Sequence, residues 1–334
     1  MSTASSLPPG PPYSLPSSPL DSSNDDDKKP GAWIVLLTQA SYLPGVIILG
    51  YSLRKVKSKY PLVAAVTPSL PEDCREALID CGIKIKEIAP LKPKDEVTVV
   101  AERFEDTWSK LAVFGFEGYK RAVLIDADML VLKNMDHLMD LPLPKDWIAA
   151  NHACVCNLDR DSWAPEDWRE ENCAYTPMVH PDALENPTQV TPSSIRTHTL
   201  LNSGLVVFTP SKVVLDQMLD FLATSPLVQD FSFPDQDFLA HFYKDKWMPI
   251  GWQYNAIKTA RYWHPKMWND DAVVNVHYIC DKPWNVGKKR GTDDEVTHKW
   301  WWDHFDEWRN LMVGYKERRS VNIVEKYASD EHQG

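Results

Sequence analysis

Residues 121–128 read Arg-Ala-Val-Leu-Ile-Asp-Ala-Asp, so an apolar run ends directly in two aspartates one residue apart. Such a continuous apolar run is typical of a strand that is covered on both faces. Ligand sites in open α/β sheets lie at the carboxyl ends of the strands. Two carboxylates this close repel each other unless a cation lies between them, and their hard oxygens favour Mg²⁺ or Mn²⁺. The alternative interpretation of Asp126 and Asp128 is a solvated acidic turn.

Strand and helix patterns alternate on both sides of this stretch. Apolar or alternating runs predict strands at 33–38, 62–67, 83–88 and 121–126, and helical spacing predicts helices at 42–57, 71–81 and 107–119. Further along, strands are expected at 204–209 and 273–278, helices at 211–222, 235–243 and 298–312, and an irregular insert at 151–199. The alternation predicts an α/β fold with a mostly parallel central sheet flanked by helices.

The composition predicts one folded domain with tails. Hydrophobic residues make up 43% of the 334 residues and charged residues 25%, as in ordinary globular proteins. Residues 1–30 are rich in Ser, Pro and Asp and predict a disordered tail. We therefore expect a single domain over 31–320, followed by a C-terminal tail over 321–334.

Charge and cysteine usage limit the partners and the compartment. Lys and Arg total 36 against 47 for Asp and Glu, a net charge of -11, which argues against nucleic acid as a partner. The sequence has no apolar run long enough to span a membrane and no apolar leader segment at its start, so we expect no membrane span. Six scattered cysteines fit reduced thiols and predict a cytoplasmic protein.

Further polar residues at element ends are candidates for the same site. His277 closes a predicted strand and could be a third metal ligand, which would shift the preference towards Mn²⁺. Lys282 is a point charge suited to phosphate oxygens. His277 has a simpler interpretation, namely a structural histidine.

Three weaker motifs lie elsewhere in the chain. Leu201-Asn202-Ser203-Gly204 opens a predicted strand, but it also fits a common turn. Asp235-Gln236-Asp237 begins a predicted helix, where an acidic cap explains Asp235 without a function. Lys110 lies in the predicted helix before the acidic strand and could simply be solvated.

The order of these motifs resembles glycosyltransferase family 8, the retaining glycosyltransferases that include glycogenin and plant galactinol synthase. The resemblance runs from about residue 32 to about residue 308. It is carried by Tyr42–Gly45, Leu49–Leu53, Ser109–Leu111, Asp126–Asp128, Leu201–Gly204, Asp235–Asp237, His277–Trp284 and Trp300–Asp303.

The resemblance implies a single nucleotide-sugar-binding domain of the GT-A type that uses a UDP-sugar and Mn²⁺, with Mg²⁺ as the alternative ion. By position, Asp126, Asp128 and His277 would hold the metal. The donor would contact Leu36, Thr38, Gln39, Tyr42, Lys110, Ala127, Ser203, Gly204 and Lys282. Asn202, Asp235 and Gln236 would face the transferred hexose, and Asp235 would be the nucleophile or charge stabiliser of a retaining reaction.

One segment departs from the family pattern. Glycogenin-like members carry a glycine in the loop between the histidine and the lysine, and their loop is one residue longer. Here the loop is Tyr278-Ile279-Cys280-Asp281. The departure affects a loop that the resemblance places against the donor diphosphate.

The acceptor is the least determined part of the prediction. The resemblance to the galactinol synthase branch is carried by residues 232–239 and 243–246, by His264-Pro265 and by the insert with Cys154, Cys156 and Cys173. It predicts a sugar, polyol or small-molecule hydroxyl acceptor for glucose or galactose. The three cysteines are interpreted as buried thiols rather than a zinc site, because no paired Cys-x-x-Cys spacing is present. Tyr262 keeps self-glucosylation open as the glycogenin-like alternative.

Two alternatives come from other classes of protein. A strand that ends in Asp-x-Asp also opens phosphatases of the haloacid dehalogenase kind, with Asn269-Asp270-Asp271 as a second acidic group. A protein of this fold without turnover could bind carbohydrate through its 14 tryptophans, which could equally be core residues. The resemblance also leaves a homodimer open.

Overall fold

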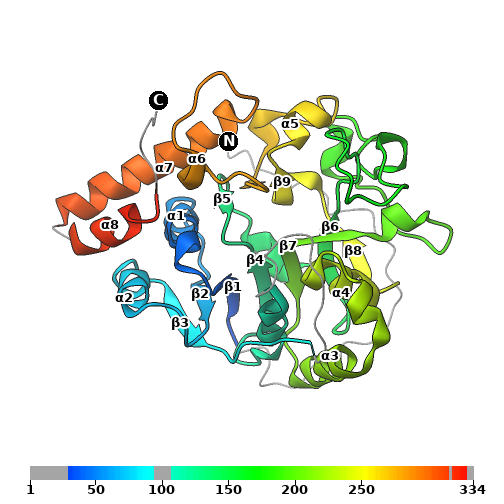
Figure 1. Ribbon diagram of the computed structural model, residues 1–334, viewed down its shortest axis with the longest axis horizontal. Coiled ribbons are helices and arrows are strands. Elements are labelled where there is room, and N and C mark those ends of the chain that lie inside the picture. The colour runs from blue at the N-terminus through cyan, green and yellow to red at the C-terminus, as the bar shows by residue number, and fades with distance from the viewer. Residues whose placement is uncertain (1–28, 94–106, 316–317, 329–334) are drawn as a thin grey trace, which may run out of the picture.

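A seven-stranded sheet forms the centre of the molecule (Figure 1). The computed structural model describes residues 29–93, 107–315 and 318–328. The strands of this sheet are β1 (Gly31–Leu37), β2 (Leu62–Val66), β3 (Lys84–Glu87), β4 (Arg121–Ile125), β6 (Ile148–His152), β7 (Leu201–Phe208) and β8 (Trp247–Pro249). Their order is β3-β2-β1-β4-β7-β6-β8, and only β7 runs antiparallel to its neighbours. The predicted mostly parallel sheet is confirmed.

The central strands are apolar throughout because both faces of the sheet are covered. In β1, Trp33, Val35 and Leu37 enter one hydrophobic core, while Ala32 and Ile34 enter the other. Successive side chains of a strand point to opposite faces. An uninterrupted apolar run therefore supplies two cores at once, as the run before Asp126 also does.

Helices divide between the two faces. One core receives side chains from α1 (Leu43–Lys55), α2 (Glu72–Asp80), α7 (Glu295–Gly314) and α8 (Arg318–Glu325). The other receives them from the 3-10 helix η4 (Thr107–Gly115), α3 (Lys212–Thr224) and α4 (Pro234–Phe242). This is the layered arrangement that alternating strands and helices predict.

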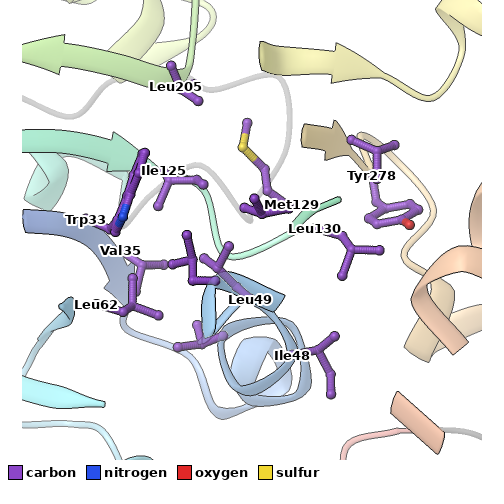
Figure 2. Close-up of a cluster of buried hydrophobic side chains, with 14 of the residues drawn as sticks. Trp33, Val35, Ile48, Leu49, Leu62, Ile125, Met129, Leu130, Leu205 and Tyr278 are labelled. Atoms are coloured by element: carbon purple, nitrogen blue, oxygen red, sulfur yellow. The ribbon is translucent and has the colours of Figure 1, made fainter. Parts of the chain in front are cut away.

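A second, three-stranded sheet extends the first core towards the site. It contains β5 (Met129–Val131), β9 (Ala256–Ile257) and β10 (Asn275–His277) in the order β5-β10-β9. Figure 2 shows Met129 and Leu130 of β5 among side chains of β1, α1, β4 and β7, with Tyr278 after β10 close by. The short α5 (Ala260–Trp263) and α6 (Pro283–Val286) follow β9 and β10.

Several predicted boundaries need correction. The helix expected at 107–119 is a 3-10 helix that ends at Gly115, because Trp108, Leu111 and Phe114 bury one face at a spacing of three residues. The strand expected at 204–209 begins at Leu201, and the one expected at 273–278 is only Asn275–His277.

The predicted domain end at residue 320 falls inside α8. Val321, Ile323 and Val324 of that helix are buried, and Ser320 donates a hydrogen bond to Asp80 of α2 at 2.7 Å. Packed structure therefore continues beyond the expected start of the C-terminal tail. Residues 1–28 of the predicted N-terminal tail and residues 329–334 of the C-terminal tail lie outside the described residues.

Most tryptophans that the structure locates are core residues. Trp33, Trp108, Trp252, Trp284, Trp301 and Trp308 are fully buried. Trp301 stacks on Phe305 within α7, with ring centroids 5.2 Å apart. Their number therefore reflects packing and is no sign of a carbohydrate-binding face, although Trp163 is an exception discussed below.

Candidate active site

Two carboxylates and an imidazole meet at the carboxyl end of β4. Asp126 and Asp128 follow Ile125, the last residue of β4. The antiparallel register of β10 on β5 pairs His277 with Met129, the residue after Asp128. The Tyr278 amide donates to the Asp128 carbonyl at 2.8 Å. Strand pairing thus brings a distant histidine beside the acidic motif.

Each aspartate presents one oxygen to a lysine and the other to His277. Asp126 Oδ1 lies 2.8 Å from Lys110 Nζ, and its Oδ2 lies 3.9 Å from His277 Nε2. Asp128 Oδ2 forms an ion pair with Lys282 Nζ, and its Oδ1 lies 3.2 Å from His277 Nε2. One oxygen of each aspartate and one imidazole nitrogen therefore converge on a common point.

A hydrogen-bond chain fixes the orientation of the imidazole. Asn255 Nδ2 donates to Asn202 Oδ1 at 2.8 Å, which leaves Asn255 Oδ1 to accept from His277 Nδ1 at 2.9 Å. His277 therefore carries a proton on Nδ1 and directs Nε2 at the two carboxylates. Metal-binding histidines are usually held in this way by a partner on the other nitrogen.

The chemistry of these donors fits a divalent cation. Two carboxylate oxygens and an imidazole lone pair that point at one another repel unless a positive charge lies among them. Hard oxygen ligands with one nitrogen suit Mn²⁺, and Mg²⁺ is the alternative. The three side chains are mostly buried, so water screens the repulsion poorly.

Two lysines, Lys110 and Lys282, pair with the carboxylates of the site. Burial alone would lower the pKa of Lys110, but Asp126 and Asp235, each 2.8 Å from Nζ, outweigh it and hold the pKa above that of an ordinary lysine. Lys282 also donates to the carbonyl of Tyr278 at 2.7 Å. Both lysines are buried, so the alternative interpretation of Lys110 as a solvated lysine is wrong.

The two aspartates of the motif differ in acidity. Burial raises the pKa of Asp126, and this effect together with the charge of Asp128 exceeds the opposing effect of Lys110. Burial acts in the same direction on Asp128, but Lys282 and His277 outweigh it and hold its pKa below the ordinary range. The pKa of Asp128 therefore lies below that of Asp126.

The next strand of the sheet supplies the opposite wall of the site. Because β7 pairs antiparallel with β4, the Asp126 amide donates to the Gly204 carbonyl at 2.8 Å. Ser203 is buried beside it, and Asn202 Nδ2 donates to Gln236 Oε1 at 3.3 Å. The motif predicted to open a strand lies within it.

Gly204 allows the imidazole to approach the sheet. A Cβ at this position would lie 2.5 Å from Cε1 and 2.8 Å from Nδ1 of His277. Real Cβ atoms do not approach other atoms this closely. Glycine is therefore required here for close packing.

The expected nucleotide side of the site lies along the ends of β1 and β4. Leu36, Thr38 and Gln39 are partly buried at the carboxyl end of β1, which runs parallel to β4, so their ends share one edge. Tyr42 packs edge-on against Trp284 with ring centroids 6.2 Å apart. The Lys282 ammonium lies 5.9 Å from the Tyr42 ring centroid.

A second close approach joins α1 to the acidic motif. A Cβ at Gly45 would lie 2.2 Å from the Ala127 carbonyl oxygen and 2.6 Å from Trp284. The Trp284 indole donates to the Ser41 carbonyl at 3.0 Å. The start of α1, Ala127 and the segment after Lys282 are thus packed directly together.

The loop that departs from the family pattern contains a residue with a strained backbone conformation. Cys280 is exposed and has a φ of 58°, in the left-handed region that glycine adopts without strain. A non-glycine residue there costs about 1–2 kcal/mol. The loop keeps a glycine-like conformation although the glycine is absent.

The sequence analysis did not identify two features of the site, the residue that orients His277 and the aromatic rings beside α4. Asn255, which orients His277, carries no motif and is recognisable only once β9 lies beside β10. Trp168 of the insert stacks on Phe233 with ring centroids 5.7 Å apart and planes 5° apart, and Trp163 packs edge-on against Phe233. Phe233 directly precedes α4, so these rings lie next to the helix that carries Asp235 and Gln236.

The insert also carries a cavity. Its volume is about 520 Å³, and its walls include Trp168, Leu158 and charged side chains such as Arg160 and Glu170. Trp163 is 46% exposed on the same insert. This side of the molecule therefore offers polar groups together with aromatic faces.

The remaining candidates from the sequence have partners of their own. Tyr262 lies on α5 and is 38% exposed, and burial followed by nearby aspartates raises its pKa. Asp270 pairs with Arg261 at 3.0 Å and accepts from the Trp268 indole. The second acidic group of the phosphatase alternative is therefore engaged elsewhere.

Comparison with known proteins identifies the family. The family description "Glycosyl transferase family 8" matches residues 33–287. Galactinol synthase 2 of Arabidopsis thaliana is 31% identical over 320 residues, which cover 91% of this chain and 90% of the relative. Galactinol synthase 1 of Ajuga reptans is 33% identical over 238 residues, 71% of this chain and 67% of the relative.

Solved structures agree on the fold. The galactosyltransferase LgtC, in complex with donor and acceptor sugar analogues, has a TM-score of 0.54 at 15% identity and covers 81% of this chain and 94% of its own. GlyE of Streptococcus pneumoniae has a TM-score of 0.52 at 16% identity, and the match covers 82% of this chain and 60% of the GlyE chain. The predicted GT-A fold is confirmed. Within residues 29–93, 107–315 and 318–328, no helix combines the length and apolar character needed to cross a bilayer.

Proposed function

Since this chain belongs to glycosyltransferase family 8, we propose that it transfers a hexose from a UDP-sugar to a hydroxyl group, with Mn²⁺ and with retention of the anomeric configuration. The donor is UDP-glucose or UDP-galactose. The acceptor is a sugar, a polyol or another small hydroxylated molecule. The family match sets aside the phosphatase alternative.

One observation carries the proposal. Asp126 Oδ2, Asp128 Oδ1 and His277 Nε2 converge, while the other oxygen of each aspartate is held by a lysine and the other nitrogen of the histidine by Asn255. Every donor is thus oriented by a partner of its own. A solvated acidic turn would show no such arrangement.

The residues divide the work between the two ends of the donor. The metal, held by Asp126, Asp128 and His277, would neutralise the diphosphate of the leaving UDP. Lys282 adds a buried positive charge on the same side and can exchange its contact with Asp128 for a phosphate oxygen. The partly buried Leu36, Thr38, Gln39 and Tyr42 offer an edge for the nucleoside.

The sugar side is built from the ends of β7 and α4. Lys110 bridges Asp126 and Asp235, so it links the diphosphate side to the carboxylate that would stabilise positive charge on the sugar. Gln236 and Asn202 hold each other at 3.3 Å and offer amide groups to the hexose hydroxyls. Asp235 is buried and lies 2.8 Å from Lys110 Nζ, so its carboxylate is held in place as a nucleophile or charge stabiliser requires.

The names of the relatives support the acceptor class. They are called galactinol synthases, and the Arabidopsis relative matches over 90% of its own length. The insert with Trp163, Trp168 and the polar cavity gives the acceptor side rings and hydrogen-bonding groups, a combination that suits a hydroxylated molecule. We propose a galactinol-synthase-like reaction on this basis.

A donor and acceptor screen tests the proposal. Release of UDP from UDP-glucose and UDP-galactose is measured with and without Mn²⁺ across linear and cyclic polyols, sugars and small alcohols. We expect turnover with one donor and a polyol that stops when the metal is chelated. Binding of a sugar without UDP release would instead support a carbohydrate-binding protein.

Replacement of Asp128 tests the metal assignment. Asp128→Ala and Asp128→Asn should each lower kcat/KM at least about a thousandfold, equivalent to about 4 kcal/mol, because the diphosphate loses its counter-ion. Asp216→Ala on the exposed face of α3 is the control and should leave activity unchanged. Unchanged turnover in folded Asp128 variants would remove the metal assignment.

Two further parts of the prediction are proposals as well. A cytoplasmic location is supported by the six cysteines, which all lie within the described residues and of which none forms a disulfide. Self-association into a homodimer would be checked by the mass of the protein in solution.

A further inference from the structure

Four sulfur and nitrogen ligands meet in a second cluster, which the proposed reaction does not use. Cys154 and Cys156 follow β6, Cys173 ends the 3-10 helix η6 (Glu170–Asn172), and His264 caps α5. Their ligand atoms all lie within 4.8 Å of one another. Cys156, Cys173 and His264 are buried, and Cys154 is partly buried.

The cluster has the composition of a closed metal site. His264 Nε2 lies 3.3 Å from the sulfur of Cys154, 3.3 Å from that of Cys156 and 3.8 Å from that of Cys173. Thiols are weak hydrogen-bond partners, so three of them satisfy a buried imidazole poorly. Three thiolates and one imidazole are the ligand set of a structural zinc ion.

The distances agree with tetrahedral coordination. With Zn–S near 2.3 Å and Zn–N near 2.05 Å, a tetrahedron places sulfurs about 3.8 Å apart and each sulfur about 3.6 Å from the nitrogen. The sulfurs of Cys173 and Cys154 are 3.9 Å apart, and the three sulfur–nitrogen distances scatter around the second value. One disulfide would leave the third cysteine and the histidine without a role.

We propose that Cys154, Cys156, Cys173 and His264 bind one zinc ion in a closed, tetrahedral, structural site. Soft thiolates select zinc over Mn²⁺ and Mg²⁺, whereas the oxygen-rich set of Asp126, Asp128 and His277 has the opposite preference. The chain thus carries two sites that choose different metals. The sequence did not indicate the zinc site because His264, its fourth ligand, lies 91 residues after Cys173.

The zinc ion ties three separate segments together. It joins the chain after β6, the middle of the insert and the end of α5, where few regular elements hold the backbone. Trp168, five residues before Cys173, stacks on Phe233 at the start of α4. On the basis of the proposed function, the zinc site therefore positions the insert beside the sugar side of the active site.

The metal content of the full-length protein tests this inference. The chain is purified without chelator, its affinity tag is removed, and zinc is measured by elemental analysis. We expect one zinc per chain in the wild type, in Cys74→Ser and in Cys280→Ser, which change cysteines outside the cluster. Cys173→Ser and His264→Ala should lose it.

Two measurements keep the test decisive if a variant folds poorly. His264→Cys creates a ligand set of four thiolates and should retain zinc. Retention of zinc in this variant but not in His264→Ala is expected only if His264 is a ligand. Cobalt in place of zinc should give the absorption of tetrahedral cobalt thiolate in the wild type and not in Cys173→Ser. Asp128→Ala should keep its zinc, so the two sites fail independently.

Several results would overturn the proposal. Folded wild-type protein with three reactive thiols and no zinc would do so, as would a disulfide between any two of the three cysteines. Stoichiometric iron or copper in place of zinc would refute the choice of metal. Zinc that persists in both Cys173→Ser and His264→Ala would show that it binds elsewhere.

Discussion

The substitution Gly204→Ala tests how the fold positions His277, the histidine proposed to bind the metal. The new Cβ would lie 2.5 Å from His277 Cε1, whereas ordinary carbon contacts begin near 3.5 Å. The imidazole must therefore move by about 1 Å. Its hydrogen bond to Asn255, now 2.9 Å long, would stretch beyond bonding range and release the tautomer that directs Nε2 at the aspartates.

The size of the effect follows from this displacement. Loss of a partner that orients a metal ligand typically weakens metal binding or activity by about 10- to 100-fold, which is about 1.4–2.8 kcal/mol. Overpacking of the site adds a loss of folding stability of about 1–3 kcal/mol. The substitution leaves the proposed nucleoside edge at the end of β1 unchanged, so binding of uridine alone should change little.

Calorimetric titration with Mn²⁺ measures the effect without reference to turnover, and the Mn²⁺ dependence of UDP release measures it during turnover. Urea unfolding gives the stability of each variant. Gly118→Ala is the matched control, because a Cβ at Gly118 meets no atom within 4 Å. It should behave as the wild type in all three measurements.

Wild-type affinity for Mn²⁺ in folded Gly204→Ala would refute the reasoning. It would mean either that His277 is not a ligand or that the ring can shift without leaving the metal. His277→Ala separates these two outcomes, because only a ligand loses metal affinity when it is removed.

Three further predictions address other parts of the molecule. Lys110→Met removes the cation between the buried carboxylate of Asp235 and the partly buried one of Asp126, and it should lower the free energy of unfolding by about 3–5 kcal/mol in urea titrations. Burial raises the pKa of Asp237 to about 6 despite the Phe233 amide that donates to it, so Asp237→Asn should gain stability relative to the wild type as the pH rises from 4 to 7, by at most about 3 kcal/mol. Incubation with UDP-glucose and Mn²⁺ should add no hexose series to wild-type protein or to Tyr262→Phe, as judged by intact mass.

The sign of the pH effect follows from proton binding. A carboxyl group whose pKa is higher in the folded state binds protons more tightly there, so its contribution to stability is lost as the pH rises through the folded pKa. A stability difference between wild type and Asp237→Asn that stays constant with pH would contradict this assignment.

Lys212→Met, in an exposed pair with Asp216, is the control for Lys110→Met and should change stability by less than about 1 kcal/mol. A hexose series that disappears in Tyr262→Phe would favour self-glucosylation.

The sequence by itself determined the features that depend on neighbouring residues. The apolar run before Asp126 predicted a strand covered on both faces, and the two aspartates at its end indicated a site at that edge of the sheet. The helical spacing of apolar residues, together with the residues that begin and end helices, predicted the ends of α1, α2 and α3 to within two residues. These signals are local, because strand alternation, helix periodicity and cap chemistry act over a few residues.

Only the tertiary structure decided which distant residues meet. The pairing of β10 with β5 and β9 brings His277 to Asp128 and gives it Asn255 as a partner, and the fold of the insert brings His264 to three cysteines. The same packing buries α8, which the composition of the last residues presented as a tail. Contacts of this kind depend on strand register and on the packing of whole layers, and no pattern within a short window of sequence encodes them.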